Sequence, residues 1–143
     1  MSENKSVGFT GPCAGMTEQQ KYAVRVTLIA LKKEGATEFH HGDCVGCDET
    51  AHYIAMEIGY TIIIHPPQDT KHRAHCVGAK AVLQPKGFLY RNKDIVYASD
   101  ILIATPETTQ EQLRSGTWAT IRYAKAANRQ VIVIPATAEK HEI

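Results

Sequence analysis

Five short apolar runs, each bounded by Gly, Pro or polar residues, constrain the fold more than any other feature of this sequence. They read SVGFT (6–10), TEFHH (37–41), TIIIH (61–65), DILIAT (100–105) and QVIVIP (130–135). Runs of this length and composition are typical of buried strands. Strands and helical segments alternate along the chain, which predicts a parallel sheet between two helical layers, because right-handed crossovers place helices on both faces.

The helical segments between these runs carry start and stop signals. The segment 17–34 begins with Thr17 and Gln20 at the spacing of a capping box, and Gly35 supplies its end. In the next segment Asp48 is placed to cap a helix that ends at Gly59. Both signals favour helices of ordinary length.

Two further helices are predicted over residues 88–99 and 117–128, before the fourth and fifth strands. A chain of 143 residues is long enough for one core of ordinary size, so we predict a single domain over 1–143. The fold class is α/β: a three-layer sandwich with a mainly parallel sheet of about five strands.

Composition excludes several classes of function. The chain is 43% hydrophobic and 22% charged, and its apolar runs are too short to cross a bilayer, so we expect no membrane association. The N-terminal sequence lacks the pattern of a signal peptide, which favours a cytoplasmic protein with reduced cysteines. A formal net charge of +1 argues against bulk nucleic-acid binding and favours a small ligand.

The segment 66–87 interrupts the alternation. It is too long for a plain connection between a strand and a helix, which favours a functional lid. Residues 65–91 hold a single acidic residue, Asp69, and five basic ones: Lys71, Arg73, Lys80, Lys86 and Arg91. The sequence therefore predicts a cationic lid.

Glycine-rich turns follow the first two strands. Ligands of such sheets bind at the carboxyl ends of the strands, where the strand order reverses. Thr10 and Gly11 follow the first strand, and Gly42 and Gly46 follow the second, where backbone N–H groups can approach an anion. Neither turn has the spacing of a dinucleotide fingerprint or a P-loop. Ordinary tight turns are the alternative interpretation.

A metal site and a redox site are two other interpretations of the second turn. Cys44 and Cys47 form a C-x-x-C pair that, with His72 and His75 or Cys76, offers four possible zinc ligands. The spacing matches no standard zinc finger, and the order of elements around the pair does not match a thioredoxin-like site. We therefore predict no metal and no other cofactor.

A second candidate anion site follows the fourth strand. Ser115, Gly116 and Thr117 open the helix predicted there, so their N–H groups and hydroxyls can surround a phosphate. The alternative is an ordinary Ser cap followed by a core-facing Trp118. Two such turns with a cationic segment between them favour a phosphorylated ligand.

Taken in order, these blocks resemble the SLOG superfamily, in a small branch similar to YpsA-type and DprA-type Rossmann proteins and to the LOG phosphoribohydrolases. The similarity covers residues 7–135 through GFTG, HHGDCVGCDETA, HPP, RNKDIVYASDILIATP and SGTWATIRYA. The resemblance implies a Rossmann-like sheet, a pocket for a nucleotide or nucleotide-derived ligand, and a homodimer or higher homo-oligomer.

The resemblance also implies roles for individual residues. Thr10 and Gly11 match its first phosphate loop, and Arg91 matches the arginine before the fourth strand. From the cationic segment we add Arg73 to Arg91 as a phosphate-binding cation. The remaining ligand-binding candidates come from the second turn and the last nest: Gly42, Asp43, Gly46, Asp48, Ser115, Gly116 and Thr117.

One departure from the pattern concerns catalysis. In the phosphoribohydrolases the nest continues to a Glu that assists cleavage of the N-glycosidic bond, and Thr120 stands at that position here. An alcohol cannot replace a carboxylate in that role. We therefore expect ligand binding as the function. The alternative is an N-glycoside hydrolase of nucleoside 5′-monophosphates with a relocated carboxylate, for which the candidates are Glu107, Glu111, Asp43 and Asp100. A zinc-stabilised interaction module is a third hypothesis.

Overall fold

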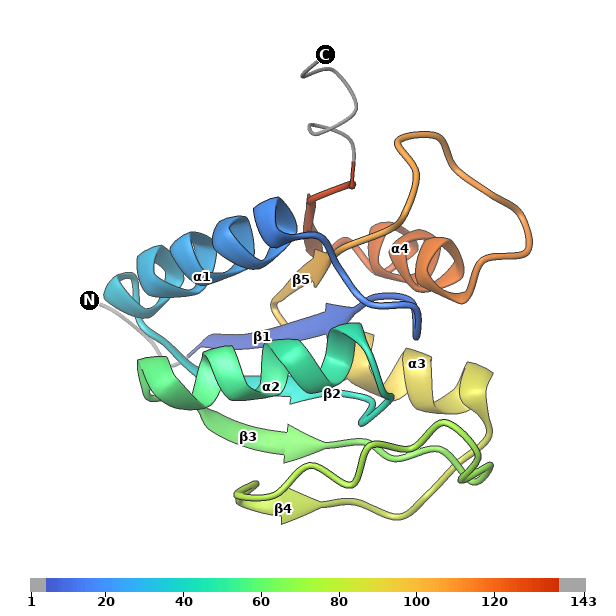
Figure 1. The fold of residues 1–143 in the computed structure, drawn as a ribbon, viewed down its shortest axis with the longest axis horizontal. Helices are drawn as coiled ribbons and strands as arrows, with labels where there is room; N and C mark the ends of the chain where they lie inside the picture. The colour runs from blue at the N-terminus through green and yellow to red at the C-terminus, as the bar shows by residue number, and fades with distance from the viewer. Residues whose placement is uncertain (1–4, 137–143) are drawn as a thin grey trace.

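The structure is a computed structural model that describes residues 5–136 of the chain (Figure 1). Ten elements follow one another in an α/β order. They are β1 (Lys5–Thr10), α1 (Glu18–Lys33), β2 (Ala36–His41), α2 (Cys47–Ile58), β3 (Thr61–Ile64), β4 (Ala81–Val82), α3 (Phe88–Ala98), β5 (Ile101–Ala104), α4 (Gly116–Ala126) and β6 (Gln130–Val133).

All six strands pair in parallel, in the order β4-β3-β2-β1-β5-β6. The predicted parallel sheet is confirmed, with one strand more than the five apolar runs indicated. The additional strand, β4, is two residues long and lies at one edge. The chain leaves β1 in one direction toward β2 and returns on its other side with β5, so the strand order reverses between β1 and β5. Ligands bind at this point in open sheets of this kind.

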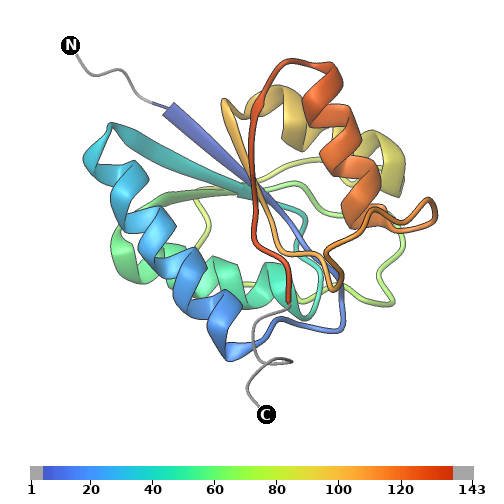
Figure 2. The same ribbon diagram turned by 90° about the horizontal axis from the view of Figure 1, so that it is seen from above.

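Two helical layers cover the sheet (Figure 2). Helices α1 and α2 lie on one face, and α3 and α4 lie on the other. Alternate side chains of each strand enter opposite cores, as the twofold period of a strand requires. Phe9 of β1 packs with Leu28 of α1 on the first face, and Leu102 of β5 packs with Ile121 of α4 on the second. These side chains are all at most 1% exposed, so both faces of the sheet are buried.

The predicted N-cap is confirmed for α1 and is wrong for α2. Thr17 and Gln20 form the predicted capping box of α1. Helix α2 ends at Gly59 in the left-handed conformation as expected, but its N-cap is Gly46, at φ 85°. Asp48 therefore lies inside the first turn of α2, and the prediction that it caps this helix is wrong. Its carboxylate instead accepts hydrogen bonds from the preceding turn.

The segment 66–87 is not a free loop. It contains β4, and Lys86 forms an isolated bridge with Pro67. The N–H of Val45 donates to the carbonyl of His72 at 2.8 Å, and the N–H of Ala74 donates to the carbonyl of Asp43 at 2.8 Å. The segment is thereby held against the β2–α2 turn. Within residues 5–136, no helix is both long enough and apolar enough to cross a membrane.

Candidate functional site

A cleft of about 490 Å³ opens at the carboxyl ends of the strands where the order reverses, and we refer to it as the β1/β5 cleft. Its wall combines the segment after β1, the turn after β2, one side of α3, and the loop and helix start that follow β5. The residues that line it are Phe9, Thr10, Gly11, Pro12, Cys13, Gly42, Cys44, Asp48, Phe88, Arg91, Asn92, Ile95, Glu107, Thr108, Gln112, Arg114, Ser115, Gly116, Thr117 and Trp118.

The cleft brings together eight of the eleven residues that the sequence indicated. Thr10, Gly11, Gly42, Asp48, Arg91, Ser115, Gly116 and Thr117 line it, whereas Asp43, Gly46 and Arg73 do not. Segments that lie far apart in the sequence therefore meet at one position, as expected for residues that follow neighbouring parallel strands.

The start of α4 offers hydrogen-bond donors to the cleft. The hydroxyl of Ser115 caps the helix by accepting from the N–H of Trp118 at 3.2 Å. The N–H groups of Gly116 and Thr117 belong to the first turn and find no acceptor among the residues the structure describes. No atom lies within 4 Å of the position that a side chain at Gly116 would occupy, so its backbone can be approached closely. The Ser cap interpretation is therefore correct, and the first two N–H groups of α4 remain available as donors.

Arg114 is the cation beside these donors. It lines the cleft, its side chain is exposed, and within residues 5–136 it has no hydrogen-bond or ion-pair partner. The sequence interpretation did not single it out, although it directly precedes the Ser-Gly-Thr run. Arg114 therefore adds a positive charge to the wall of the cleft.

Arg91 also lines the cleft, but most of its hydrogen-bonding capacity is used within the protein. It is 5% exposed. Its Nη1 donates to the carbonyls of Gly42 and His65 at 2.6 and 3.0 Å, and its Nε donates to Asn92 at 2.8 Å. A side chain at Gly42 would collide with this guanidinium. Arg91 therefore fixes the β2–α2 turn against α3, in addition to placing a positive charge in the wall of the cleft.

Arg73 is the second cation that the sequence indicated, and it lies away from the cleft. Its Nε donates to the carboxylate of Asp43 at 2.9 Å. The same carboxylate accepts from the N–H of Cys76 at 3.0 Å. Although burial acts in the opposite direction, the hydrogen bonds from Cys76 and Arg73 hold the pKa of Asp43 below its usual value. The buried Asp43 and the partly buried Arg73 form an ion pair that anchors the segment 66–87, and none of residues 66–87 lines the β1/β5 cleft.

The backbone conformation and close packing of the turn explain why position 46 is a glycine. At φ 85° it adopts a conformation that favours glycine, and a side chain there would collide with the backbone of Cys13. The N–H of Cys47 donates to the carbonyl of Pro12 at 3.3 Å. The turn after β2 thus packs directly on the loop after β1, and at the start of α2 this N–H is occupied by the protein itself.

Asp48 stands out within the turn. One of its carboxylate oxygens, Oδ2, accepts from the N–H groups of Gly42 and Cys44 at 3.1 and 3.3 Å. The other, Oδ1, is buried and has no hydrogen-bond partner among the described residues. Burial raises the pKa of Asp48 to about 6, although the nearby Arg91 and the two N–H groups act against this shift. A carboxylate with an unsatisfied oxygen at the wall of a cleft is costly for stability and marks a candidate functional group.

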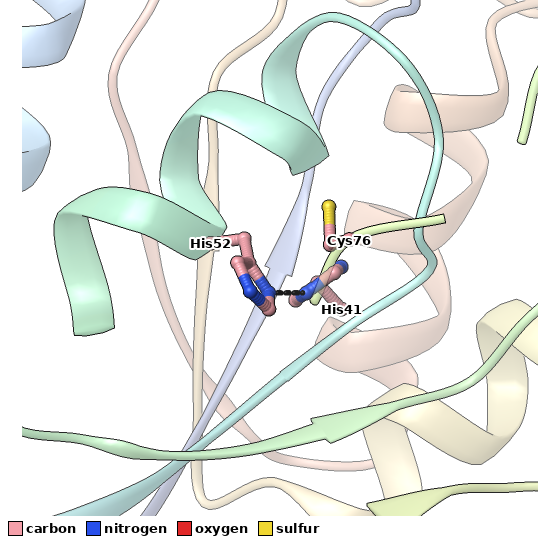
Figure 3. Close-up of side chains that lie close together, drawn as sticks. All are labelled: His41, His52 and Cys76. Atoms are coloured by element: carbon pink, nitrogen blue, oxygen red, sulfur yellow. Dashed lines mark hydrogen bonds between the residues drawn. The ribbon is translucent and has the colours of Figure 1, made fainter. Parts of the chain in front are cut away.

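The four cysteines are free, and among the described residues neither Cys44 nor Cys47 belongs to a group of three side chains that could hold a metal ion. Within residues 5–136, the one group of three side chains whose ligand atoms lie within 4.8 Å of one another is His41, His52 and Cys76 (Figure 3). This group is different from the one considered from sequence.

The hydrogen bonds of this group do not fit a metal ion. Burial, followed by the neighbouring His52, lowers the pKa of His41 to about 3, so His41 is neutral. Its Nδ1 accepts from the N–H of Asp43 at 2.9 Å, so its Nε2 carries the proton and donates to His52 Nδ1 at 2.8 Å. His52 Nε2 then donates to the carbonyl of Val77 at 2.7 Å. All four ring nitrogens are therefore occupied by hydrogen bonds. A metal on His41 Nε2 would displace the proton to Nδ1, where it would point at the N–H of Asp43.

Thr120 does not face the cleft. It is fully buried, and its hydroxyl donates to the carbonyl of Gly116 at 2.9 Å. The carboxylates that could replace a catalytic Glu lie in different places. Glu111 pairs with Arg122, Asp43 pairs with Arg73, Asp100 accepts from the N–H of Ser6, and Glu107 lines the cleft. Asp48 and Glu107 are the two carboxylates of the β1/β5 cleft.

Several solved structures share the fold of this chain. No protein-family model and no curated protein matches it. A molybdenum cofactor binding protein from the phototrophic bacterium Rippkaea orientalis matches with a TM-score of 0.70 and 22% identity, over 94% of this chain and 78% of that one. The Moco carrier protein from Chlamydomonas reinhardtii matches with a TM-score of 0.70 and 20% identity, over 96% and 80%.

A third neighbour is DNA processing protein A from Streptococcus pneumoniae, with a TM-score of 0.70 and 24% identity, over 94% of this chain and 51% of that one. The chain shares the fold of these neighbours, and the α/β fold with a parallel sheet that the sequence predicted is confirmed. Fold alone does not define a ligand.

Proposed function

We propose that this chain binds a small phosphorylated ligand of the nucleotide type in the β1/β5 cleft, with the phosphate at the start of α4. The observation that carries the proposal is the arrangement of unpaired donors there. Gly116, Thr117 and the exposed Arg114 all line the cleft, and within residues 5–136 the two N–H groups and the Arg114 side chain have no hydrogen-bond partner. A helix N-terminus combined with an unpaired arginine favours an anion.

The size of the cleft and the neighbours support a small ligand. A volume of about 490 Å³ lies in the range of pockets that hold small molecules and cofactors. Two of the neighbours are named for binding or carrying the molybdenum cofactor, so this fold holds small-molecule ligands in other proteins. The nucleotide class itself comes from the sequence resemblance.

The test measures binding of guanosine 5′-monophosphate by calorimetry in matched variants. Arg114→Ala should weaken binding by about 10- to 100-fold, the effect of losing a charge-assisted hydrogen bond. Lys71→Ala is the control, because Lys71 is an exposed cation of the segment 66–87 and does not line the cleft. Equal loss in both variants would mean that only the general charge matters, and the proposed site would be wrong.

A hydrolase is the second candidate, and one observation favours it. Asp48 and Glu107 both line the cleft, and glycosidic cleavage commonly uses two carboxylates. In this scheme water adds to the sugar carbon as the N-glycosidic bond breaks, and the base leaves with a proton. Chromatography of nucleoside 5′-monophosphates incubated with the protein tests it. Rapid base release that is abolished by Glu107→Gln would favour the hydrolase over binding alone.

We also propose that the chain forms a homodimer or higher homo-oligomer and acts in the cytoplasm. Exposed apolar side chains on the outer surface of α1 support association: Tyr22, Val26 and Ile29 are 71%, 46% and 40% exposed. Sedimentation of the purified chain tests association, and Tyr22→Glu should weaken it. The four free cysteines accord with a reducing compartment.

A further inference from the structure

We propose that Asp48 determines the specificity of the β1/β5 cleft by accepting a hydrogen bond, through its unpartnered Oδ1, from a hydroxyl or N–H group of the phosphorylated ligand. The inference rests on the proposed function and adds the chemical nature of the part of the ligand that lies beyond the phosphate. The required ligand has an anionic group at one end and an uncharged hydrogen-bond donor at the other.

Asp48 and the donors at the start of α4 differ in burial and in hydrogen-bonding character. Arg114 is exposed, and with the free N–H groups of α4 it offers only donors. Asp48 is 5% exposed, and a deprotonated carboxylate offers only acceptors. A second phosphate or carboxylate of the ligand is therefore disfavoured beside Asp48, whereas a sugar hydroxyl or a ring N–H is favoured.

The hydrogen bonds of the turn leave one oxygen of Asp48 without a partner among the described residues. Oδ2 of Asp48 is already shared by the N–H groups of Gly42 and Cys44, and these bonds fix the orientation of the carboxylate. Oδ1 is buried without a partner. A protein group that completes the bond is absent from the described residues, and a buried unpaired acceptor costs free energy until a donor reaches it. A ligand that supplies this donor recovers the cost, which is how a site built from polar groups rejects analogues that lack them.

The surroundings of Asp48 keep it available as an acceptor near neutral pH. The groups that face it are the guanidinium of Arg91 on α3, the carboxylate of Asp43 in the same turn, and the thiols of Cys44, Cys47 and Cys76. Burial raises the pKa of the Cys44 thiol to about 12 and that of Cys47 to about 11, so these thiols are uncharged. Arg91 supplies the one positive charge in this set.

The experiment compares three probes by calorimetry at pH 7.5: methyl phosphate, ribose 5-phosphate and guanosine 5′-monophosphate. All carry a phosphate monoester, so the ratio of their dissociation constants removes the phosphate contribution. We expect the wild-type chain to bind at least one of the two larger probes more tightly than methyl phosphate. Asp48→Asn keeps an oxygen for the turn and replaces the acceptor at Oδ1 by a donor, so it should reduce this preference by about 10- to 100-fold.

The probes identify where the donor comes from, and a control variant isolates the site. A preference for ribose 5-phosphate that Asp48→Asn removes assigns the bond to a sugar hydroxyl. A preference that only guanosine 5′-monophosphate shows assigns it to the N–H groups of the base. Asp69→Asn removes an exposed carboxylate outside the cleft and should leave both ratios unchanged.

The outcomes separate this inference from the function on which it rests. If all three probes bind and Asp48→Asn retains the wild-type preference, Asp48 does not determine specificity although the phosphate site is real. If the wild-type chain shows no preference among the probes, the inference is equally wrong. If it binds none of them, the proposed function fails and the inference fails with it.

A second readout uses the wild-type chain alone. The preference for the larger probe should fall several-fold between pH 7.5 and pH 5.5 as Asp48 takes up a proton, because its pKa is about 6. A preference that is constant over this range overturns the inference even if the Asp48→Asn variant does not fold.

Discussion

Replacement of Asp48 by asparagine should stabilise the folded chain at pH 7. The pKa of this carboxyl is raised from 3.8 to about 6 in the folded state. Each unit corresponds to 1.36 kcal/mol, so charging Asp48 costs up to about 3 kcal/mol of stability above pH 6. The folded chain binds the proton more tightly than the unfolded chain, so this cost is absent below pH 4 and develops as the pH rises through 4–6. An uncharged Asn does not incur it, and we expect a gain of about 1–3 kcal/mol.

Asp43 is the matched control, because it is a buried aspartate of the same turn in the opposite situation. Its carboxylate is paired with Arg73 at 2.9 Å and bonded to the N–H of Cys76, and its pKa is lowered. Removing one partner of a buried ion pair costs about 3–5 kcal/mol. Asp43→Asn should therefore destabilise the chain at pH 7.

Urea unfolding at pH 7.5 and pH 5.5 measures both effects. The advantage of Asp48→Asn over the wild type should be largest at pH 7.5 and smaller at pH 5.5, where part of the wild-type population is already protonated. A variant that is less stable than the wild type at pH 7.5, or whose advantage grows on acidification, would refute the reasoning. In that case Oδ1 has a partner that satisfies its charge.

Three other perturbations have clear expected outcomes. Arg91→Ala should lower the unfolding free energy by about 2–4 kcal/mol in urea, because it leaves buried carbonyls and Asp48 without a donor or a counter-charge, and an unchanged midpoint would contradict the packing described. Acidification from pH 7 to pH 5 should destabilise the wild type. In the folded chain the pKa values of His41 and His65 are lowered from 6.5 to about 3 and about 4, so the unfolded chain binds protons more readily and stability is lost as the pH drops below 6.5. The stability lost through the two histidines exceeds the stability gained through Asp48 over this pH range. A urea midpoint that is higher at pH 5 than at pH 7 would contradict this expectation. Thr120→Glu should destabilise the chain without adding hydrolysis, because it places a carboxylate in the core, and base release by a well-folded variant would overturn this expectation.

Zinc content is a further direct test. The hydrogen bonds of His41 and His52 predict no stoichiometric zinc in the purified chain. Elemental analysis that finds about one zinc per chain, lost on chelation together with the fold, would contradict this prediction.

Features set by neighbouring residues could be predicted from the sequence. Thr17 and Gln20 interact across a single turn of backbone, so the start of α1 is encoded locally. The five apolar runs form strands for the same reason, and the positions of Thr10 and Ser115 at one edge follow from the parallel order of their strands. β4 was missed because its two residues have no periodicity, and its pairing with β3 defines it.

The partners of charged side chains could not be predicted, because they are set by contacts across the fold. Arg91 and Arg73 were chosen from sequence as phosphate ligands, yet Arg91 binds backbone carbonyls and Arg73 binds a carboxylate. Arg114 has no partner among the residues that the structure describes and lines the cleft, but nothing in its local sequence distinguishes it from an ordinary exposed arginine. The unpaired oxygen of Asp48 became visible only once the turn that uses its other oxygen was known.

The central claim is that phosphate binds at the start of α4, and amide chemical shifts test it most directly. In a titration of the ¹⁵N-labelled chain with guanosine 5′-monophosphate, the backbone N–H signals of Gly116 and Thr117 should move most, because these donors find no acceptor within residues 5–136. The signals of Lys71 and Lys80, which lie outside the cleft, should not move. Shifts confined to the segment 66–87, with unchanged signals at Gly116 and Thr117, would contradict the account.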